Sequence, residues 1–481
     1  PTPFPLDHLA LRGAADAAAL TVGEVTISYA ELDDAVGRNA AELLRLGLRP
    51  GDRVASWMGK TMLACVLPLA AARAGLVHVP INPVLRRAQV AHILVDSGAR
   101  LLIANSARLD SLEPGDLGEA GAVPLETWLA PGPALPPSSH DPETLAALFY
   151  TSGSTGRPKG VMLTHANLWL GAISVSHYLG LQPDERTLCV LPLAFDYGQN
   201  QLLSTWAAGG CAVAFDYLLP RDVVAAVRRH DVTTLAGVPP LWLQLVEQEW
   251  GDSGSSLRTL TNSGGHLPET VVRRMRALFP GARLHLMYGL TEAFRSASLD
   301  PALVDNHPDR VGRAIPFANL RIARPDGGEA APGEEGELVH YGPLVAKGYW
   351  NDPARTAERF RDGAVWSGDT MVMGLDGLLR FRGRDDAMIK VSGNRISPTE
   401  IEEAALASGV VREAVAFGVP DDRTGQAIVL VAVGGGDEGA LLGHLKRQLP
   451  AFMIPTRILW RDAMPVGPNG KLDRAALKAA L

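Results

Sequence analysis

A run of glycines, short hydroxyl side chains and one lysine occupies residues 150–160, in the order YTSGSTGRPKG. Glycines let the backbone adopt positive φ and bring its N–H groups close to an anion, and the hydroxyls add further donors. The order of residues differs from a Walker A loop. The run predicts a phosphate-binding loop between two short strands, with a solvated turn as the structural alternative. The residues expected to hold phosphate are Thr151, Ser152, Gly153, Ser154, Thr155, Gly156 and Lys159.

The segment TSGSTGRPKG resembles the signature loop of the acyl-adenylate-forming (AMP-binding) superfamily, which includes acyl-CoA ligases and the adenylation domains of peptide synthetases. Further matching segments cover nearly the whole chain: MYGLTEAFRS, VWSGDT, IKVSGNRISPTE and WRDAMPVGPNGKLDR. With these segments the chain is similar to the AMP-forming acyl-CoA ligases of the exosortase A-associated type. The resemblance implies ATP and Mg²⁺ as cofactors, and CoA or a carrier-protein phosphopantetheine as the acceptor thiol.

The same resemblance implies roles for residues that would otherwise be interpreted as surface charges or turns. Glu292 is expected to bind Mg²⁺, which suits a carboxylate and phosphate oxygens, and Thr291 and Glu292 are expected to be catalytic. Tyr288 is expected against adenine, and Asp369 and Arg384 at the ribose. The residues implied to contact the nucleotide, besides the phosphate loop, are Gly264, Gly265, His266, Tyr288, Gly289, Leu290, Asp369 and Arg384.

Lys471, in the segment Pro468-Asn-Gly-Lys471, resembles the lysine with which the superfamily catalyses adenylation. Its charge is expected to bridge the substrate carboxylate and the α-phosphate while the carboxylate attacks. The resemblance also implies a hinge at Asp386, about which the C-terminal part rotates between two half-reactions. It implies that Lys390 and Gly393 face the tunnel for the thiol.

The segment Phe195-Asp196-Tyr197 aligns with the gate of the acid pocket and is assigned to the substrate. A Phe-Asp pair at this position resembles amino-acid adenylation domains, in which the aspartate pairs with the substrate's α-ammonium group. A buried carboxylate needs such a partner or becomes protonated. In the alternative, Asp196 bonds backbone within a turn.

Composition narrows the function classes. A chain of 481 residues is too long for a single hydrophobic core, so we expect two or more domains. A net charge of −7 does not indicate a basic surface, which disfavours nucleic acid and anionic membranes as partners. The most apolar window, residues 62–80, is interrupted by Pro68 and Arg73 and indicates a buried helix rather than a membrane span. Three scattered cysteines do not indicate disulfides or zinc, and they favour a cytoplasmic location.

The pattern of elements predicts an α/β fold. Strand and helix patterns alternate from residue 25, with helices expected at 30–46, 61–74, 87–97, 164–177 and 202–208, which is typical of doubly wound parallel sheets. Residues 311–381 change to short strands and predict a small β-rich subdomain. We therefore expect an N-terminal adenylation domain at 1–384, a hinge at 385–386 and a small mobile α+β domain at 387–481. Ser397 is expected to cap the first helix of that domain.

These observations predict an enzyme that converts a carboxylic acid to an acyl-AMP and then to a thioester. Its partners would be a small carboxylic or amino acid and an acyl or peptidyl carrier protein acting in trans. One alternative is an amino-acid-adenylating enzyme that loads a stand-alone carrier protein. Another is a nucleotide-binding protein without turnover, which the combination of Glu292, Asp369, Arg384 and Lys471 disfavours.

Overall fold

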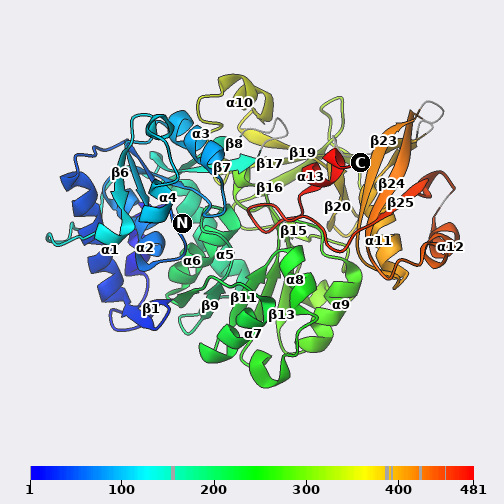
Figure 1. The fold of residues 1–481 in the computed structure, drawn as a ribbon, viewed down its shortest axis with the longest axis horizontal. Helices are drawn as coiled ribbons and strands as arrows, with labels where there is room; N and C mark the ends of the chain where they lie inside the picture. Colours follow the sequence, from blue (N-terminus) through cyan, green and yellow to red (C-terminus); the bar gives the residue numbers. More distant parts are fainter. Residues whose placement is uncertain (1, 153–157, 385–388, 392–393, 422–424, 450) are drawn as a thin grey trace.

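The computed structural model describes residues 2–152, 158–384, 389–391, 394–421, 425–449 and 451–481. These residues form four β-sheets (Figure 1). The strands of the nine-stranded sheet, from edge to edge, are β15 (Arg313–Ala314), β14 (Ala297–Ser298), β13 (Arg283–Tyr288), β12 (Thr259–Asn262), β11 (Thr234–Gly237), β9 (Arg186–Cys189), β10 (Cys211–Ala214), β1 (Ala18–Val22) and β2 (Val25–Ser28). The strands from β13 to β1 run parallel, and the edge strands are antiparallel.

A six-stranded sheet lies beside the first. Its strands are β6 (Gly121–Pro124), β5 (Leu101–Ala104), β3 (Arg53–Trp57), β4 (Val77–Pro80), β7 (Leu145–Ser152) and β8 (Pro158–Thr164), in that order. All neighbours are parallel except β7 and β8, which pair antiparallel. The inner strands β4 and β5 are buried along their whole length, as expected where helices cover both faces of a parallel sheet.

Helices pack on these sheets and separate them (Figure 1). They are α1 (Tyr29–Arg45), α2 (Met62–Arg73), α3 (Arg87–Ser97), α4 (Ser106–Leu109), α5 (His165–Leu179), α6 (Asp196–Ala208), α7 (Pro220–Arg229), α8 (Pro239–Leu245) and α9 (Glu269–Leu278). Helix α1 begins with a capping box, in which the Glu31 amide donates to Ser28 Oγ and the Ser28 amide donates to Glu31 Oε2. Helix α6 begins at Asp196, earlier than the predicted start at Leu202.

A five-stranded antiparallel sheet follows, as the change of pattern after residue 311 predicts. It consists of β16 (Asn319–Ala323), β17 (Glu335–Tyr341), β19 (Ala364–Met373) and β18 (Phe360–Arg361), with β20 (Leu379–Arg384) paired to β19. Helix α10 (Pro353–Arg359) leads into β18.

The last sheet belongs to the C-terminal part, and Figure 1 shows this sheet, mainly in orange, at one end of the molecule. Its strands are β22 (Asn394–Ile396), β21 (Ile389–Val391), β24 (Gly425–Gly434) and β23 (Val411–Asp421), with β25 (Arg457–Trp460) parallel to β24. Its helices are α11 (Pro398–Ala407), α12 (Glu438–Gln448) and α13 (Arg474–Ala479). The predicted α/β class, with a large N-terminal domain and a smaller C-terminal one, is confirmed.

The hydrophobic cores follow this division. One extended core joins the two large sheets and their helices and includes Trp206 and Trp242, which are fully buried. The last sheet has cores of its own, formed on its two faces around Ile401 and Leu430 and around Val431 and Leu477. Each part therefore buries its own apolar side chains.

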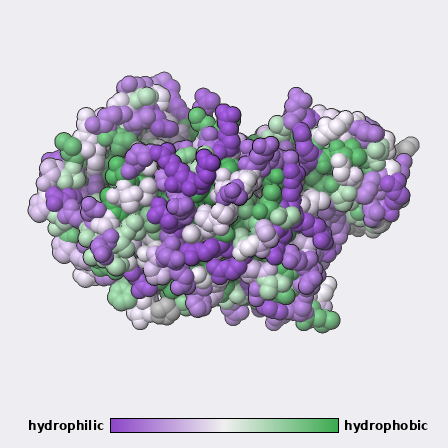
Figure 2. All heavy atoms as spheres, turned by 90° about the horizontal axis from the view of Figure 1, so that it is seen from below, coloured by the Kyte–Doolittle hydropathy of each residue, from purple (hydrophilic) through white to green (hydrophobic). Residues whose placement is uncertain are grey.

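The surface is mixed in character. Figure 2 shows one face on which hydrophilic atoms dominate and apolar atoms lie in scattered groups. Within the described ranges, none of the helices combines the length and the apolar character needed to span a bilayer.

Candidate active site

The predicted phosphate loop lies at the end of a β-hairpin. Strands β7 and β8 pair so that Thr151 lies opposite Lys159 and Ser152 opposite Pro158. Gly153, Ser154, Thr155 and Gly156 lie outside the described residues. The hairpin nevertheless explains how the two ends of the loop are held together, because its strands belong to the six-stranded sheet.

The side chain of Lys159 extends from this hairpin toward Glu292, in the segment YGLTE at residues 288–292. Its Nζ lies 3.8 Å from Glu292 Oε1 and 3.9 Å from the centroid of the Tyr349 ring. The Tyr349 hydroxyl donates a hydrogen bond of 2.7 Å to the same Glu292 oxygen. Burial and the adjacent Glu292 charge raise the pKa of Tyr349, so its hydroxyl stays protonated and remains a donor.

Tyr349 positions the carboxylate predicted to bind metal, a role that was not predicted from the sequence. It is fully buried next to the short helical turn Thr291–Ala293. The two side chains are 57 positions apart, so local sequence patterns give no signal for their contact.

Glu292 is a suitable ligand for Mg²⁺. Within the described part of the chain, no group of three or more His, Cys, Asp or Glu side chains gathers into a metal site. Mg²⁺ does not require one, because it is commonly held by one or two carboxylates together with substrate phosphates and waters. Glu292 supplies one carboxylate that is already oriented by Tyr349 and is only 12% exposed.

Tyr288 and Asp369 come from different sheets and meet. Tyr288 ends β13, and its hydroxyl donates to Asp369 Oδ2 on β19. The register of β19 and β20 places Arg384 opposite Asp369, so the two residues predicted to bind ribose are neighbours in the backbone. Gly289 and Leu290 follow Tyr288 directly and lead into the turn with Thr291.

The glycine turn after β12 lies against the C-terminal part. Gly264 has φ +82°, and a Cβ atom there would come within 2.7 Å of Lys471 Cε. A Cβ at Gly265 would lie 3.1 Å from Pro239 Cγ. His266 Nε2 lies 2.8 Å from Glu403 Oε1 on α11. The turn therefore needs glycine for close approach of the lysine.

Lys471 reaches the large domain on a short loop. Its Nζ lies 4.4 Å from the centroid of the Phe195 ring. Asn82 holds the loop, because its side-chain amide donates to Pro468 O at 2.7 Å and to Asn469 Oδ1 at 2.8 Å. Sequence reasoning missed Asn82, which is 386 positions from its partner.

Asp196 is in the first turn of α6 and is 5% exposed. Its Oδ1 accepts a hydrogen bond of 3.0 Å from the Thr291 hydroxyl. The alternative that Asp196 bonds backbone in a turn does not match the structure, because the residue is helical and, among the described residues, its side chain bonds the Thr291 hydroxyl. Tyr197, the next residue, is buried, and its hydroxyl lies 2.5 Å from Thr261 Oγ1. The structure thus brings Lys471, Phe195, Asp196 and Thr291 into one contiguous group.

Four other predicted residues can be placed only in part or not at all. Arg384 ends β20 and Lys390 lies in β21, paired with Arg395. The predicted hinge residue Asp386 and the predicted tunnel residue Gly393 lie outside the described residues.

Both parts of the chain match models of known protein families. Residues 7–350 match the model of the AMP-binding enzyme family, and residues 400–471 match that of the AMP-binding enzyme C-terminal domain. A feruloyl-CoA synthase of Amycolatopsis sp is 36% identical over 97% of this chain and 96% of its own. An L-proline–[L-prolyl-carrier protein] ligase of Pseudomonas fluorescens is 32% identical over 94% and 93%.

Among solved structures, ATP-bound MatB from Rhodopseudomonas palustris superimposes with a TM-score of 0.92 and 27% identity, covering 100% of this chain and 99% of that one. The narrower resemblance to exosortase A-associated ligases is not confirmed by these proteins and stays a prediction. The family models and the relatives agree over nearly the whole chain. The chain therefore belongs to the AMP-binding enzyme family.

Proposed function

We propose that this enzyme activates a small carboxylic acid with ATP and transfers the acyl group to a thiol. A carboxylate oxygen attacks the α-phosphorus, the α–β phosphoanhydride bond breaks, and pyrophosphate leaves. The thiol sulfur then attacks the acyl carbon, AMP leaves, and the thiol proton passes to solvent. The observation that carries the proposal is Lys471, which a separate domain brings beside Gly264 and Phe195. Relatives named as CoA and carrier-protein ligases support it.

The residues divide the work in the first half-reaction. Lys471 lies where a cation can stabilise charge that develops at the attacked phosphorus. Lys159 lies nearer the phosphate loop and the Glu292 carboxylate, and it would hold the departing pyrophosphate. Mg²⁺ bound at Glu292 would neutralise phosphate charge. Asp369, beside Tyr288, would accept hydrogen bonds from the ribose.

A second candidate is an amino acid as the substrate, loaded onto a carrier protein. Asp196 is a buried carboxylate, and in the described part of the chain its side chain has Thr291 as a partner but no ion pair. A substrate ammonium group would supply the missing counter-charge. The carrier-protein ligase that activates proline supports this candidate by its similarity.

Three further assignments belong to the proposal. The division into 1–384, a hinge at 385–386 and 387–481 is supported by the separate cores of the last sheet. A carrier protein acting in trans would be the second acceptor besides CoA. A cytoplasmic location is supported by Cys65, Cys189 and Cys211, which are buried free thiols.

Pyrophosphate exchange tests the proposal. Purified enzyme, Mg·ATP and labelled pyrophosphate are incubated with fatty, aryl, hydroxy and amino acids, and we expect exchange with at least one class. ATP binding without exchange for any acid would leave a nucleotide-binding protein without turnover.

The Asp196→Asn variant separates the two candidates. If the substrate carries an α-ammonium group, we expect exchange to fall by about 100-fold or more with the amino acid, because a desolvated ion pair is lost. The matched des-amino acid should be affected little. Equal loss with both acids would contradict an ammonium-binding role for Asp196.

A further inference from the structure

A narrow cavity lies beside the proposed acid site, between β9, β11, β12 and the helices α5 and α6. It has about 20 Å³ of free space for a water-sized sphere, which is room for one or two waters but not for a long acyl chain. Apolar side chains such as Val175, Leu179 and Met287 form part of its wall. The rest of the wall is polar and contains Tyr197, Asn200 and Arg295.

Arg295 is the one arginine or lysine among the described residues that line this cavity. It is 2% exposed, and its guanidinium lies 4.6 Å from the centroid of the Tyr197 ring. Nη1 of the guanidinium donates a hydrogen bond of 2.7 Å to Ser263 Oγ, and the Tyr178 hydroxyl is a further polar neighbour of Arg295. Its Nε, like Asn200 Oδ1 in the same cavity, has no hydrogen-bond partner within the described residues.

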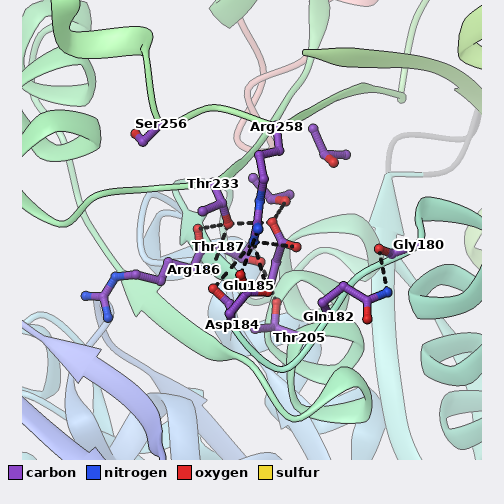
Figure 3. Close-up of polar contacts among 12 residues, drawn as sticks. Gly180, Gln182, Asp184, Glu185, Arg186, Thr187, Thr205, Thr233, Ser256 and Arg258 are labelled. Carbon is purple, nitrogen blue, oxygen red and sulfur yellow. Dashed lines mark hydrogen bonds and ion pairs between the residues drawn. The ribbon is translucent and has the colours of Figure 1, made fainter. Parts of the chain in front are cut away.

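No acidic side chain in the described part of the chain forms an ion pair with Arg295. Another buried acidic side chain of the large domain, Glu185, is 2% exposed and lies in a cluster of polar contacts (Figure 3). Glu185 accepts hydrogen bonds from the hydroxyls of Thr233 and Thr234, and Arg258 pairs with it at 3.3 Å. The Glu185 charge is therefore already compensated, whereas a buried guanidinium without an anion is costly.

The cavity is also close to the reacting end of the acid. Ser263, which accepts from Arg295, is followed directly by Gly264, which lies against Lys471. Aromatic rings also connect the lysine to the arginine. Lys471 Nζ lies over the Phe195 ring, and the centroid of that ring is 6.2 Å from the centroid of the Tyr197 ring. The Tyr197 ring in turn contacts Arg295. A short acid whose carboxylate meets Lys471 would point its other end at Arg295.

We infer that Arg295 is a specificity-determining residue that binds a second carboxylate on the acid substrate. The inference rests on the proposed function and names its substrate class: short acids with an anionic group at the far end. A planar carboxylate fits the guanidinium edge that carries Nε, with two parallel hydrogen bonds. Tyr197 and Ser263 hold the guanidinium in place, so little ordering is needed on binding.

Pyrophosphate exchange with matched pairs of acids tests the inference. Each pair has the same chain length with and without a terminal carboxylate: succinate and butyrate, glutarate and valerate, glutamate and norvaline. We expect the wild-type enzyme to prefer the diacid. In Arg295→Met, kcat/KM for the diacid should fall by about 100-fold or more, while kcat/KM for the matched monoacid stays the same or rises. Arg295→Lys should keep part of the preference, because lysine retains the charge but not the fork.

Arg321→Met is a matched control. Arg321 also lies over a tyrosine, at 5.4 Å from the Tyr341 ring centroid, and its Nε also has no hydrogen-bond partner among the described residues, but it is on β16 and outside the cavity. Thermal unfolding and ATP affinity confirm that each variant is folded. A wild-type preference for monoacids, or equal losses for both acids in Arg295→Met, would overturn the inference while exchange itself upholds the proposed function. Exchange with no acid would overturn both.

Discussion

Single side chains in this site work through partners that are distant in sequence. Glu292 is oriented by Tyr349, Asp196 by Thr291, and the Lys471 loop by Asn82. In each pair one hydrogen bond fixes a group that would otherwise rotate, which is how an outer contact tunes a reacting group.

Lys471→Ala is expected to lower the rate of adenylate formation by several orders of magnitude, because the positive charge near the attacked phosphorus is lost. Thioester formation from supplied acyl-AMP should stay within a few-fold of wild type. The two half-reactions are measured separately by pyrophosphate exchange and by consumption of acyl-AMP. Lys478→Ala, at an exposed lysine on α13, is the matched control. An unchanged exchange rate in Lys471→Ala would contradict this role.

Roles for Asp196, Glu292 and Lys471 were predicted from their motifs and the family resemblance, and these roles stay predictions. The structure places the three residues in one region. Tyr349 and Asn82 could not be assigned, because their contacts span 57 and 386 positions and depend on how the sheets pack.

At the scale of elements, the α/β alternation was predicted well where the apolar runs are strong. Helix α3 has the predicted bounds, 87–97. Helix α6 starts earlier than predicted because its first turn contains Tyr197, Gly198 and polar residues, which are buried by their surroundings rather than by helical periodicity. Ser397 precedes α11 as predicted but makes no side-chain cap, since its hydroxyl donates to Arg382 O.

The contact between the glycine turn at residues 263–266 and helix α11 leads to a prediction about how the two domains are held together. His266 and Glu403 join the two domains at 2.8 Å. Burial alone would raise the pKa of Glu403, but its hydrogen bond with His266 and nearby positive charges lower the pKa overall, so the carboxylate stays ionised. Glu403→Gln is expected to weaken this domain arrangement and to slow adenylation by about 3- to 10-fold, a modest effect because the contact is partly exposed to solvent.

This prediction is tested by measuring adenylation and thioester formation separately. Adenylation should slow in Glu403→Gln, and thioester formation should not, because the pair belongs to the arrangement that places Lys471 near Gly264. Glu438→Gln, at an exposed carboxylate on α12, is the control. Equal slowing of both half-reactions would contradict a role in this one arrangement.

At the scale of the whole molecule, length and changes of pattern were enough to predict a large α/β part and a smaller unit after it. They could not give the order of the nine strands, because β1 and β2 join that sheet from the start of the chain. Four histidines in the large domain are buried: His78, His165, His285 and His340. Burial is the main cause of their lowered pKa values, to about 3 for His78 and about 4 for the others.

These histidines predict a loss of stability in acid. Their folded pKa values lie below the ordinary value of about 6.5, so the unfolded chain binds protons first as the pH falls. Stability should therefore decrease from about pH 6.5 down to about pH 4, by up to about 1.4 kcal/mol per pH unit for each histidine. The midpoint of thermal unfolding, measured across this range, should fall less steeply in His340→Gln than in wild type. The exposed His177→Gln is the control, and an unchanged pH profile in His340→Gln would argue against the prediction.

The cavity that contains Arg295 has a consequence for how this enzyme could diversify. All of its lining residues lie between positions 175 and 295, within the large domain. The C-terminal domain contributes Lys471, which is proposed to act on the carboxylate of any acid, and it packs around cores of its own. If Arg295 selects the acid as inferred, a chimera of this large domain with a relative's C-terminal domain should keep this enzyme's preference among acids.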